Sequence, residues 1–208
     1  MIGDISPKIK KQVEKGITIL RKGGVIAFPT DTVYGVGSGI YDEKAIEQVF
    51  AVKQRTHNMS LPILLADVAQ VHEVAQDIPA YAWRLIDCFW PGGLTLIVYR
   101  SRVIKDTITN GGDTVAIRLP NHPVPYALIK GCGMPLIGSS ANISCQPSVT
   151  TAEEVRAQFK DTVDLIIDGI PAPKGTESTI IDVTGEAPVI IRQGYIPREV
   201  VEEAVGKR

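Results

Sequence analysis

Polar side chains that could hold an anionic substrate gather in four short stretches of the sequence. The first stretch, residues 28–35 (FPTDTVYG), directly follows an apolar segment at residues 25–28. The hydroxyls of Thr30 and Thr32 are therefore predicted at the end of a buried strand, where open α/β sheets bind ligands. A turn closed by its own Asx and hydroxyl hydrogen bonds would explain the same residues equally well.

The second stretch, Lys53-Gln54-Arg55, ends a predicted helix. Cations at a helix C-terminus complement the helix dipole, so a solvated cap is the ordinary interpretation. The functional interpretation is a pair of cations that grip phosphates, because arginine offers a planar fork and lysine a point charge. We expect Lys53 and Arg55 to be exposed near the helix end on either interpretation.

The third stretch, residues 138–144 (GSSANIS), combines polar side chains with small residues that allow close backbone approach, which favours a carboxylate or phosphate site. The fourth group is Glu177-Ser178-Thr179, which leads into a strand, together with Arg192-Gln193-Gly194 after the next strand. Arg118 belongs with them because it lies in an apolar strand. A charge there is costly unless it is paired. Arg118 is therefore expected either on a solvent-exposed face of the sheet or at a position where it binds an anion.

Familiar catalytic and nucleotide motifs are missing from the sequence. It has no G-x-x-x-x-G-K-[ST] motif, and Ile40 occupies the position where a dinucleotide fingerprint in residues 35–40 needs a small residue. The histidines are scattered, and the three cysteines show no C-x-x-C spacing, which argues against a zinc site, a disulfide framework or a Cys-His pair. Covalent catalysis therefore finds no support.

The composition indicates one ordinary globular domain spanning residues 1–208. The hydrophobic share is 44%, the charged share 22% and the formal net charge −1, which supplies no overall basic field for nucleic acid. The longest apolar runs, such as residues 61–66, are too short to cross a bilayer. The N-terminus lacks an apolar signal segment, so we expect a cytoplasmic protein without membrane contact.

Periodicity and capping signals predict the elements that must position these loops. Ser6 and Pro7 begin the first helix, Asp42 the second, and Thr151 with Glu154 forms a capping box. The helices are expected at residues 7–22, 43–53, 68–74, 80–89, 123–130, 152–159 and from Pro197 onward. The strands are expected at residues 25–28, 61–65, 94–99, 114–119, 136–138, 165–168, 179–183 and 189–192. This order predicts an α/β domain with a mixed sheet.

Seven segments in this order resemble the YrdC-like family across nearly the whole chain. They are residues 29–35 (PTDTVYG), 53–55 (KQR), 91–95 (PGGLT), 116–120 (AIRLP), 140–144 (SANIS), 178–182 (STIID) and 192–194 (RQG). The resemblance implies a twisted open mixed sheet with flanking helices, the YrdC/RibB-like fold. It also implies L-threonylcarbamoyl-adenylate synthase activity, which serves the threonylcarbamoyladenosine modification of tRNA.

The resemblance also assigns roles to residues and names ligands. The residues matched to ATP are Lys53, Arg55, Thr114, Ser140, Asn142, Ser148 and Arg192. Of these, Lys53, Arg55 and Arg192 resemble the cations that carry the chemistry, whereas Thr114 and Ser148 match less sharply. The residues matched to threonine are Thr30, Arg118 and Ser178, with Arg118 on the carboxylate. The implied substrates are ATP, L-threonine and bicarbonate, and Mg²⁺ is expected on the ATP phosphates because no carboxylate cluster stands out.

Three positions depart from the family pattern. Thr56 stands where the family usually has a proline after Lys-x-Arg, Gly93 replaces a proline, and Cys145 replaces a glycine. We expect altered loop stiffness there rather than lost chemistry. The sequence also ends soon after its last predicted helix, so we expect the additional C-terminal domain of longer family members to be absent and the site to be more open.

Two alternatives come from other functional classes. An RNA-binding module for tRNA or double-stranded RNA could use the lysine-rich first helix, although a solvated helix face explains those charges more simply. A carbamoyl-adenylate-forming domain is the enzymatic alternative, but the larger proteins of that type carry segments for which this chain has no room. The expected partner of the main hypothesis is the downstream complex that transfers the threonylcarbamoyl group to tRNA.

Overall fold

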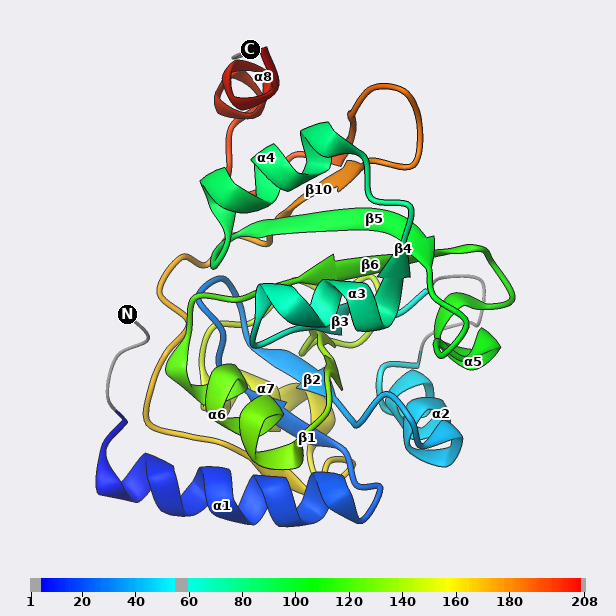
Figure 1. Cartoon of the computed structure of the whole chain (residues 1–208). Helices are drawn as coiled ribbons and strands as arrows, with labels where there is room; N and C mark the ends of the chain where they lie inside the picture. Colours follow the sequence, from blue (N-terminus) through cyan, green and yellow to red (C-terminus); the bar gives the residue numbers. More distant parts are fainter. Residues whose placement is uncertain (1–4, 55–59, 207–208) are drawn as a thin grey trace.

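The computed structural model describes residues 5–54 and 60–206, and it places two mixed β-sheets between flanking helices (Figure 1). The helices are α1 (Pro7–Arg21), α2 (Glu43–Val52), the 3-10 turn η1 (Val68–Gln70), α3 (Val71–Val74), α4 (Ala80–Phe89), α5 (Asp106–Thr109), α6 (Pro123–Cys132), α7 (Ala152–Phe159) and α8 (Arg198–Gly206). The strands are β1 (Ile26–Phe28), β2 (Gly35–Gly37), β3 (Ile63–Leu64), β4 (Ala75–Gln76), β5 (Leu94–Arg100), β6 (Thr114–Arg118), β7 (Leu136–Ile137), β8 (Ser139–Ser140), β9 (Leu165–Ile166), β10 (Thr179–Asp182) and β11 (Val189–Arg192).

The larger sheet has the order β11-β10-β5-β6-β3-β7, with β4 paired to β5, and the smaller sheet has the order β8-β2-β1-β9. Both sheets are mixed: β5 runs parallel to β10 and antiparallel to β6, while β1 runs parallel to β9 and antiparallel to β2. The chain crosses between the sheets at Gly138, where an added Cβ would lie 2.3 Å from the Leu64 side chain. A glycine is therefore required at this crossing.

Local signals explain how the smaller sheet is covered. The Ser6 side chain caps α1, and Pro7 occupies the first helical turn, where its missing N–H is harmless. The apolar face of α1 buries Ile9, Val13 and Leu20 in a core cluster shared with α6. Figure 1 shows α1 lying below α6 at the base of the molecule. At the start of α7, Thr151 and Glu154 form the predicted capping box.

The predicted mixed α/β fold is confirmed, as are the long helices, but several short elements were not predicted. These are β2, β4, β8 and α5, each of two to four residues. Ser139 and Ser140 belong to the stretch interpreted as a loop, yet they pair with Val36 and Gly35 as β8. Two small polar residues carry no periodicity, so the pairing depends on the neighbouring strand. Across residues 5–54 and 60–206, no helix is long and apolar enough to cross a membrane.

Candidate functional site

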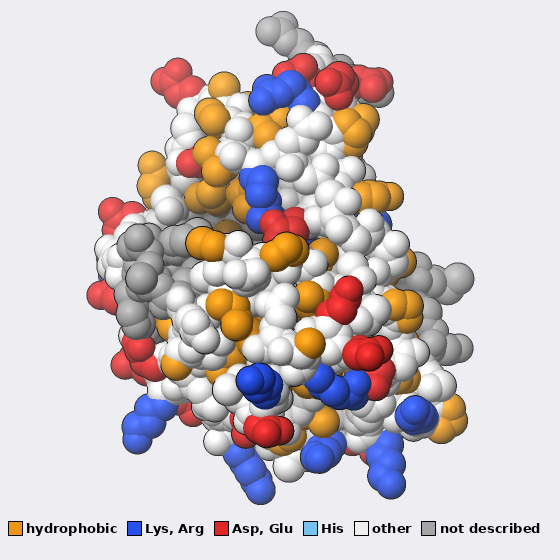
Figure 2. Space-filling view, turned by 180° about the vertical axis from the view of Figure 1, so that it is seen from behind, with side chains coloured by type: hydrophobic (Ala, Val, Ile, Leu, Met, Phe, Trp, Pro, Cys, Tyr) orange, Lys and Arg blue, Asp and Glu red, His pale blue; other side chains and the backbone are white. Residues whose placement is uncertain are grey.

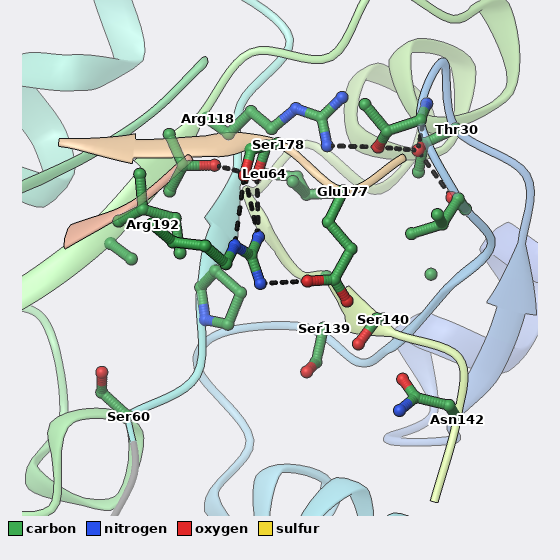
Figure 3. Close-up of a pocket in the computed structure, with 18 of the residues that line it drawn as sticks. Thr30, Ser60, Leu64, Arg118, Ser139, Ser140, Asn142, Glu177, Ser178 and Arg192 are labelled. Carbon is green, nitrogen blue, oxygen red and sulfur yellow. Dashed lines mark hydrogen bonds and ion pairs between the residues drawn. The ribbon is translucent and has the colours of Figure 1, made fainter. Parts of the chain in front are cut away.

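A cavity of about 630 Å³ lies where the two sheets meet, and the loops singled out in the sequence converge on it (Figure 3). Predicted site residues that line the cavity are Thr30, Lys53, Thr114, Arg118, Ser140, Asn142, Ser178 and Arg192. Ser148 does not line it, but its hydroxyl donates a hydrogen bond to the carboxylate of Glu177, which does. Arg55 lies outside the described residues.

Arg118, at the end of β6, is an enclosed cation of the cavity, with 6% of its surface exposed. Its Nη2 donates to Asp31 Oδ1 at 2.6 Å, its Nη1 to Thr32 Oγ1 at 2.8 Å and its Nε to the Gly92 carbonyl at 2.9 Å. Burial lowers the pKa of the guanidinium, and the Asp31 carboxylate opposes that shift. Arg118 therefore does not lie on a solvent-exposed face: it forms a buried ion pair with Asp31 and also lines the cavity.

The hydroxyls around Arg118 form a fixed cluster. Thr30 Oγ1 donates to the Val33 carbonyl at 2.7 Å and accepts from the backbone N–H of Thr32 at 3.1 Å. These bonds close the turn after β1, as the local interpretation of this loop predicted. Ser178 Oγ, directly before β10, and Thr95 Oγ1, on β5, lie 2.7 Å apart. Thr30 and Ser178 therefore sit close to the predicted carboxylate-binding group with their orientations already set.

Arg192, at the end of β11, enters the same cavity from another direction and is far more open, with 41% of its side chain exposed. Its Nη1 pairs with the Glu177 carboxylate, and its Nη2 donates to the Ser178 carbonyl at 2.9 Å. Figure 3 shows Arg192 lying between Glu177 and Ser178. An anion entering the cavity would compete with Glu177 for this guanidinium.

Lys53 differs from the prediction that it is exposed, because only 2% of its surface is accessible. Its Nζ donates to the carbonyl oxygens of Ser140 and Asn142, the latter at 2.8 Å, while the backbone N–H of Ser144 donates to the Lys53 carbonyl at 2.9 Å. These charge-assisted hydrogen bonds offset part of the cost of burying the ammonium group. Lys53 thus holds residues 140–144 in place and lines the cavity at the same time.

The side-chain amide of Asn142 has its nitrogen hydrogen-bonded, while its oxygen has no partner among residues 5–54 and 60–206. Its Nδ2 donates to the carbonyls of Ile143 and Gln146 at 3.1 and 2.6 Å, which fixes the orientation of the amide. Its Oδ1 is buried and has no hydrogen-bond partner among the described residues. A buried unpaired acceptor is costly, so this oxygen is suited to a ligand that brings a donor or a cation.

Sequence reasoning missed several polar residues of the site. Asp31 and Glu177 lay within quoted stretches but received no role, although each now pairs with a site arginine. The sequence signal that could have identified them is a carboxylate next to hydroxyl residues: Asp31 lies between two threonines, and Glu177 directly precedes Ser178. Lys174 carried no signal, because its partner Asp31 is distant in sequence: Nζ lies 3.3 Å from Asp31 Oδ2. Within the described ranges, no group of three or more His, Cys, Asp and Glu side chains could hold a metal ion.

The departures from the family pattern have distinct structural settings. Cys145 lines the cavity with φ at +68°, a left-handed conformation that glycine adopts more readily. At Gly93 an added Cβ would lie 3.1 Å from the ring of Tyr195, so a larger residue needs that ring to shift. Thr56 lies outside the described residues. Neither Gly93 nor Cys145 supplies a side chain to the hydrogen bonds of Arg118, Arg192 or Lys53 described above.

Comparisons with known proteins agree with this geometry. The family model Sua5_yciO_yrdC, described as "Telomere recombination", matches residues 18–194. "Threonylcarbamoyl-AMP synthase" of Pyrococcus abyssi is 42% identical over 188 residues, covering 90% of this chain and 55% of that protein. The Bacillus subtilis protein of the same name is 37% identical over 196 residues, covering 94% and 57%. The chain therefore spans little more than half the length of these relatives.

A solved structure makes the same connection. The structure of Pyrococcus abyssi Sua5 complexed with L-threonine superposes with a TM-score of 0.93 and 38% identity. The aligned region covers 99% of this chain and 60% of that one. Because the family model matches most of the sequence and the fold agrees at this level, the chain belongs to the Sua5/YciO/YrdC family.

Proposed function

We propose that this chain is an L-threonylcarbamoyl-adenylate synthase, a nucleotidyltransferase that makes threonylcarbamoyl-AMP and pyrophosphate from L-threonine, bicarbonate or CO2, and ATP. The observation that carries the proposal is one cavity lined by two arginines in contrasting surroundings. Arg118 is enclosed and oriented by protein groups, whereas Arg192 is half open to solvent. The names of the Pyrococcus abyssi and Bacillus subtilis relatives support the same reaction.

The enclosed end of the cavity suits the amino acid. The contacts of Arg118 with Asp31, Thr32 and Gly92 use three of the five N–H groups of the guanidinium, which leaves two for a carboxylate. The Ser178 and Thr95 hydroxyls, directly before β10 and on β5, line the same cavity. A ligand carboxylate and hydroxyl would therefore meet groups that need little reorganisation, which favours tight and oriented binding.

The open end of the cavity suits the nucleotide. Arg192 can exchange Glu177 for phosphate, and Lys53 fixes the loop of Ser140 and Asn142 beside it. The buried Oδ1 of Asn142, which has no hydrogen-bond partner among the described residues, cannot donate to a phosphate oxygen, so it fits a water or a cation that accompanies the phosphates. We propose that Mg²⁺ is carried by the ATP phosphates, that Asn142 Oδ1 would help to hold it, and that it would neutralise phosphate charge when bound.

The reaction asks the protein mainly for positioning. The α-amine of threonine adds to CO2, loses a proton and becomes a carbamate. A carbamate oxygen then attacks the α-phosphorus of ATP, and the bond to pyrophosphate breaks. Arg118 would hold the amino acid while Arg192 stabilises charge on the phosphates, so no protein nucleophile is needed. Holding the two reactants in line can contribute roughly 7–11 kcal/mol in favourable cases.

The direct test is product formation by the purified protein. Labelled L-threonine, bicarbonate, ATP and Mg²⁺ should give pyrophosphate and a threonine-containing adenylate in equal amounts, detected by chromatography. Omitting threonine should abolish both products. Pyrophosphate release that depends on carbamoyl phosphate and not on threonine would support the carbamoyl-adenylate alternative, and the absence of any adenylate would overturn the proposal.

The remaining partners belong to the same proposal. We propose a cytoplasmic protein that passes its adenylate to a tRNA threonylcarbamoyl-transfer complex. Figure 2 shows Lys and Arg side chains along the lower edge of the molecule, where α1 lies. The residues of this basic face are exposed and are Lys8, Lys10, Lys11, Lys15, Arg21 and Lys22. Salt-sensitive binding of tRNA or double-stranded RNA without ATP turnover would support the RNA-binding alternative.

A further inference from the structure

We infer that Lys174 is a positioning residue for the amino acid carboxylate, and that it acts through Asp31 rather than by touching the substrate. The inference rests on the proposed function. Lys174 lies in the segment between β9 and β10, and it is not among the residues that line the cavity. Its Nζ lies 3.3 Å from Asp31 Oδ2, on the opposite oxygen from the one that accepts from Arg118.

Asp31 is the centre of this arrangement. Its side chain is 6% exposed, and Oδ1 accepts from Arg118 Nη2 at 2.6 Å and from the backbone N–H of Asn121 at 3.1 Å. A carboxylate so enclosed orients the guanidinium, but it also neutralises the charge that should attract a substrate carboxylate. Arg118 and Asp31 alone form a neutral pair.

Lys174 changes that balance. Two cations and one carboxylate leave the cluster of Arg118, Asp31 and Lys174 with a net charge of +1. The Lys174 side chain is 22% exposed, so solvent screens its charge less than that of a surface lysine. The nearby His122 is held neutral, since burial lowers its pKa to about 4. Asp31 removes positive potential from the enclosed end of the cavity, and Lys174 therefore restores it.

The position of Lys174 is fixed by its surroundings. Its Nζ lies 3.7 Å from the centre of the Tyr195 ring, which makes a cation–π contact. The backbone N–H of the next residue, Gly175, donates to the Thr32 carbonyl at 3.0 Å. The backbone hydrogen bond joins the segment that carries Lys174 to the turn that carries Asp31, and the Tyr195 ring restricts the Lys174 side chain. Little side-chain freedom is therefore lost when the cluster forms.

The test compares two ligands that differ in one group, L-threonine and L-threoninol, which lacks the carboxylate. Calorimetric titration of Lys174→Met should give about 3- to 10-fold weaker threonine binding, with unchanged threoninol and ATP binding. Lys174→Arg keeps the charge and should restore most of the threonine affinity. In turnover assays the KM for threonine should rise while kcat changes little, because uniform binding is lost.

A matched control is available in Lys130, which pairs with Asp67 at 3.2 Å and lies over the Tyr126 ring at 5.9 Å on the surface. Lys130→Met should leave threonine binding unchanged. If Lys174→Met does not fold, Tyr195→Leu offers a second route, with a smaller loss that is again specific to threonine. Equal losses for threonine and threoninol, or no loss at all, would overturn the inference. Failure of the wild-type protein to bind threonine would instead overturn the proposed function.

Discussion

Arg118 and Arg192, which both line the cavity, carry the same guanidinium group in opposite surroundings. Arg118 is enclosed, and its carboxylate partner Asp31 is itself buried. Arg192 is 41% exposed, and its partner Glu177 is 31% exposed. Breaking a buried ion pair strands a charge away from water, whereas an exposed pair exchanges partners with solvent at little cost. The enclosed end of the cavity, at Arg118, is therefore rigid. At the open end, Arg192 can exchange Glu177 for another anion.

The largest effect is expected from Asp31→Asn, because it leaves the Arg118 guanidinium buried without its carboxylate. The free energy of unfolding should fall by about 3–5 kcal/mol, measured by urea denaturation. The surface pair of Asp67 and Lys130 provides the control, and Asp67→Asn should lower stability by less than about 1 kcal/mol. Equal effects of the two variants would remove the contrast between the enclosed and the open end.

The second effect concerns the pH dependence of stability and His122. This residue follows Asn121, whose backbone N–H contacts Asp31, and it caps α6 through Nδ1. Burial lowers the pKa of His122 to about 4, so the unfolded chain binds a proton at higher pH than the folded chain does. Stability should therefore decrease as the pH falls from about 6.5 to about 4, by about 3 kcal/mol at most.

His122→Asn tests this assignment, because asparagine keeps the N-cap but cannot titrate. The acid-dependent loss between pH 6.5 and 4 should shrink in thermal or urea unfolding of this variant. An unchanged pH profile would show that other groups cause the loss.

The third effect, from Lys53→Ala, sharpens the comparison because Lys53 lies at the proposed nucleotide end of the cavity and yet is buried. Losing the charged contacts to the carbonyls of Ser140 and Asn142 should destabilise the fold by roughly 1.5–3 kcal/mol and weaken ATP binding at the same time. Thermal unfolding and ATP titration would measure both. Weaker ATP binding at unchanged stability would instead support the expectation from the sequence that Lys53 is exposed and binds phosphate.

The smallest effect on stability is expected from Glu177→Gln, which removes the carboxylate that competes for Arg192. Stability should change by less than about 1 kcal/mol, because both side chains are partly exposed. Binding of pyrophosphate should tighten by about 3-fold or more in calorimetric titration. Weaker pyrophosphate binding would mean that Glu177 orients Arg192 rather than occupying it.

Much of the fold could be predicted from the sequence where the signals are local. The caps at Ser6 and Thr151 and the apolar faces of α1 and α2 depend on residues within a few positions of one another. Arg118 was singled out because a charge in an apolar strand is costly at any location. The short strands β2 and β8 could not be predicted, since they form by pairing with other strands: β2 pairs with β1 and with β8, which is distant from it in the sequence.

The sequence by itself indicated the polar loops that line the cavity, because hydroxyls, small residues and lone cations are visible in the order of the residues. Only the tertiary structure decided the partner of each cation. Asp31 and Lys174 are 143 positions apart, and Lys53 reaches carbonyls 87 and 89 positions away. Such contacts arise when the two sheets pack against each other, and no local pattern records them. Burial follows from the same packing, so the sequence indicated that Lys53 matters but not that it is enclosed.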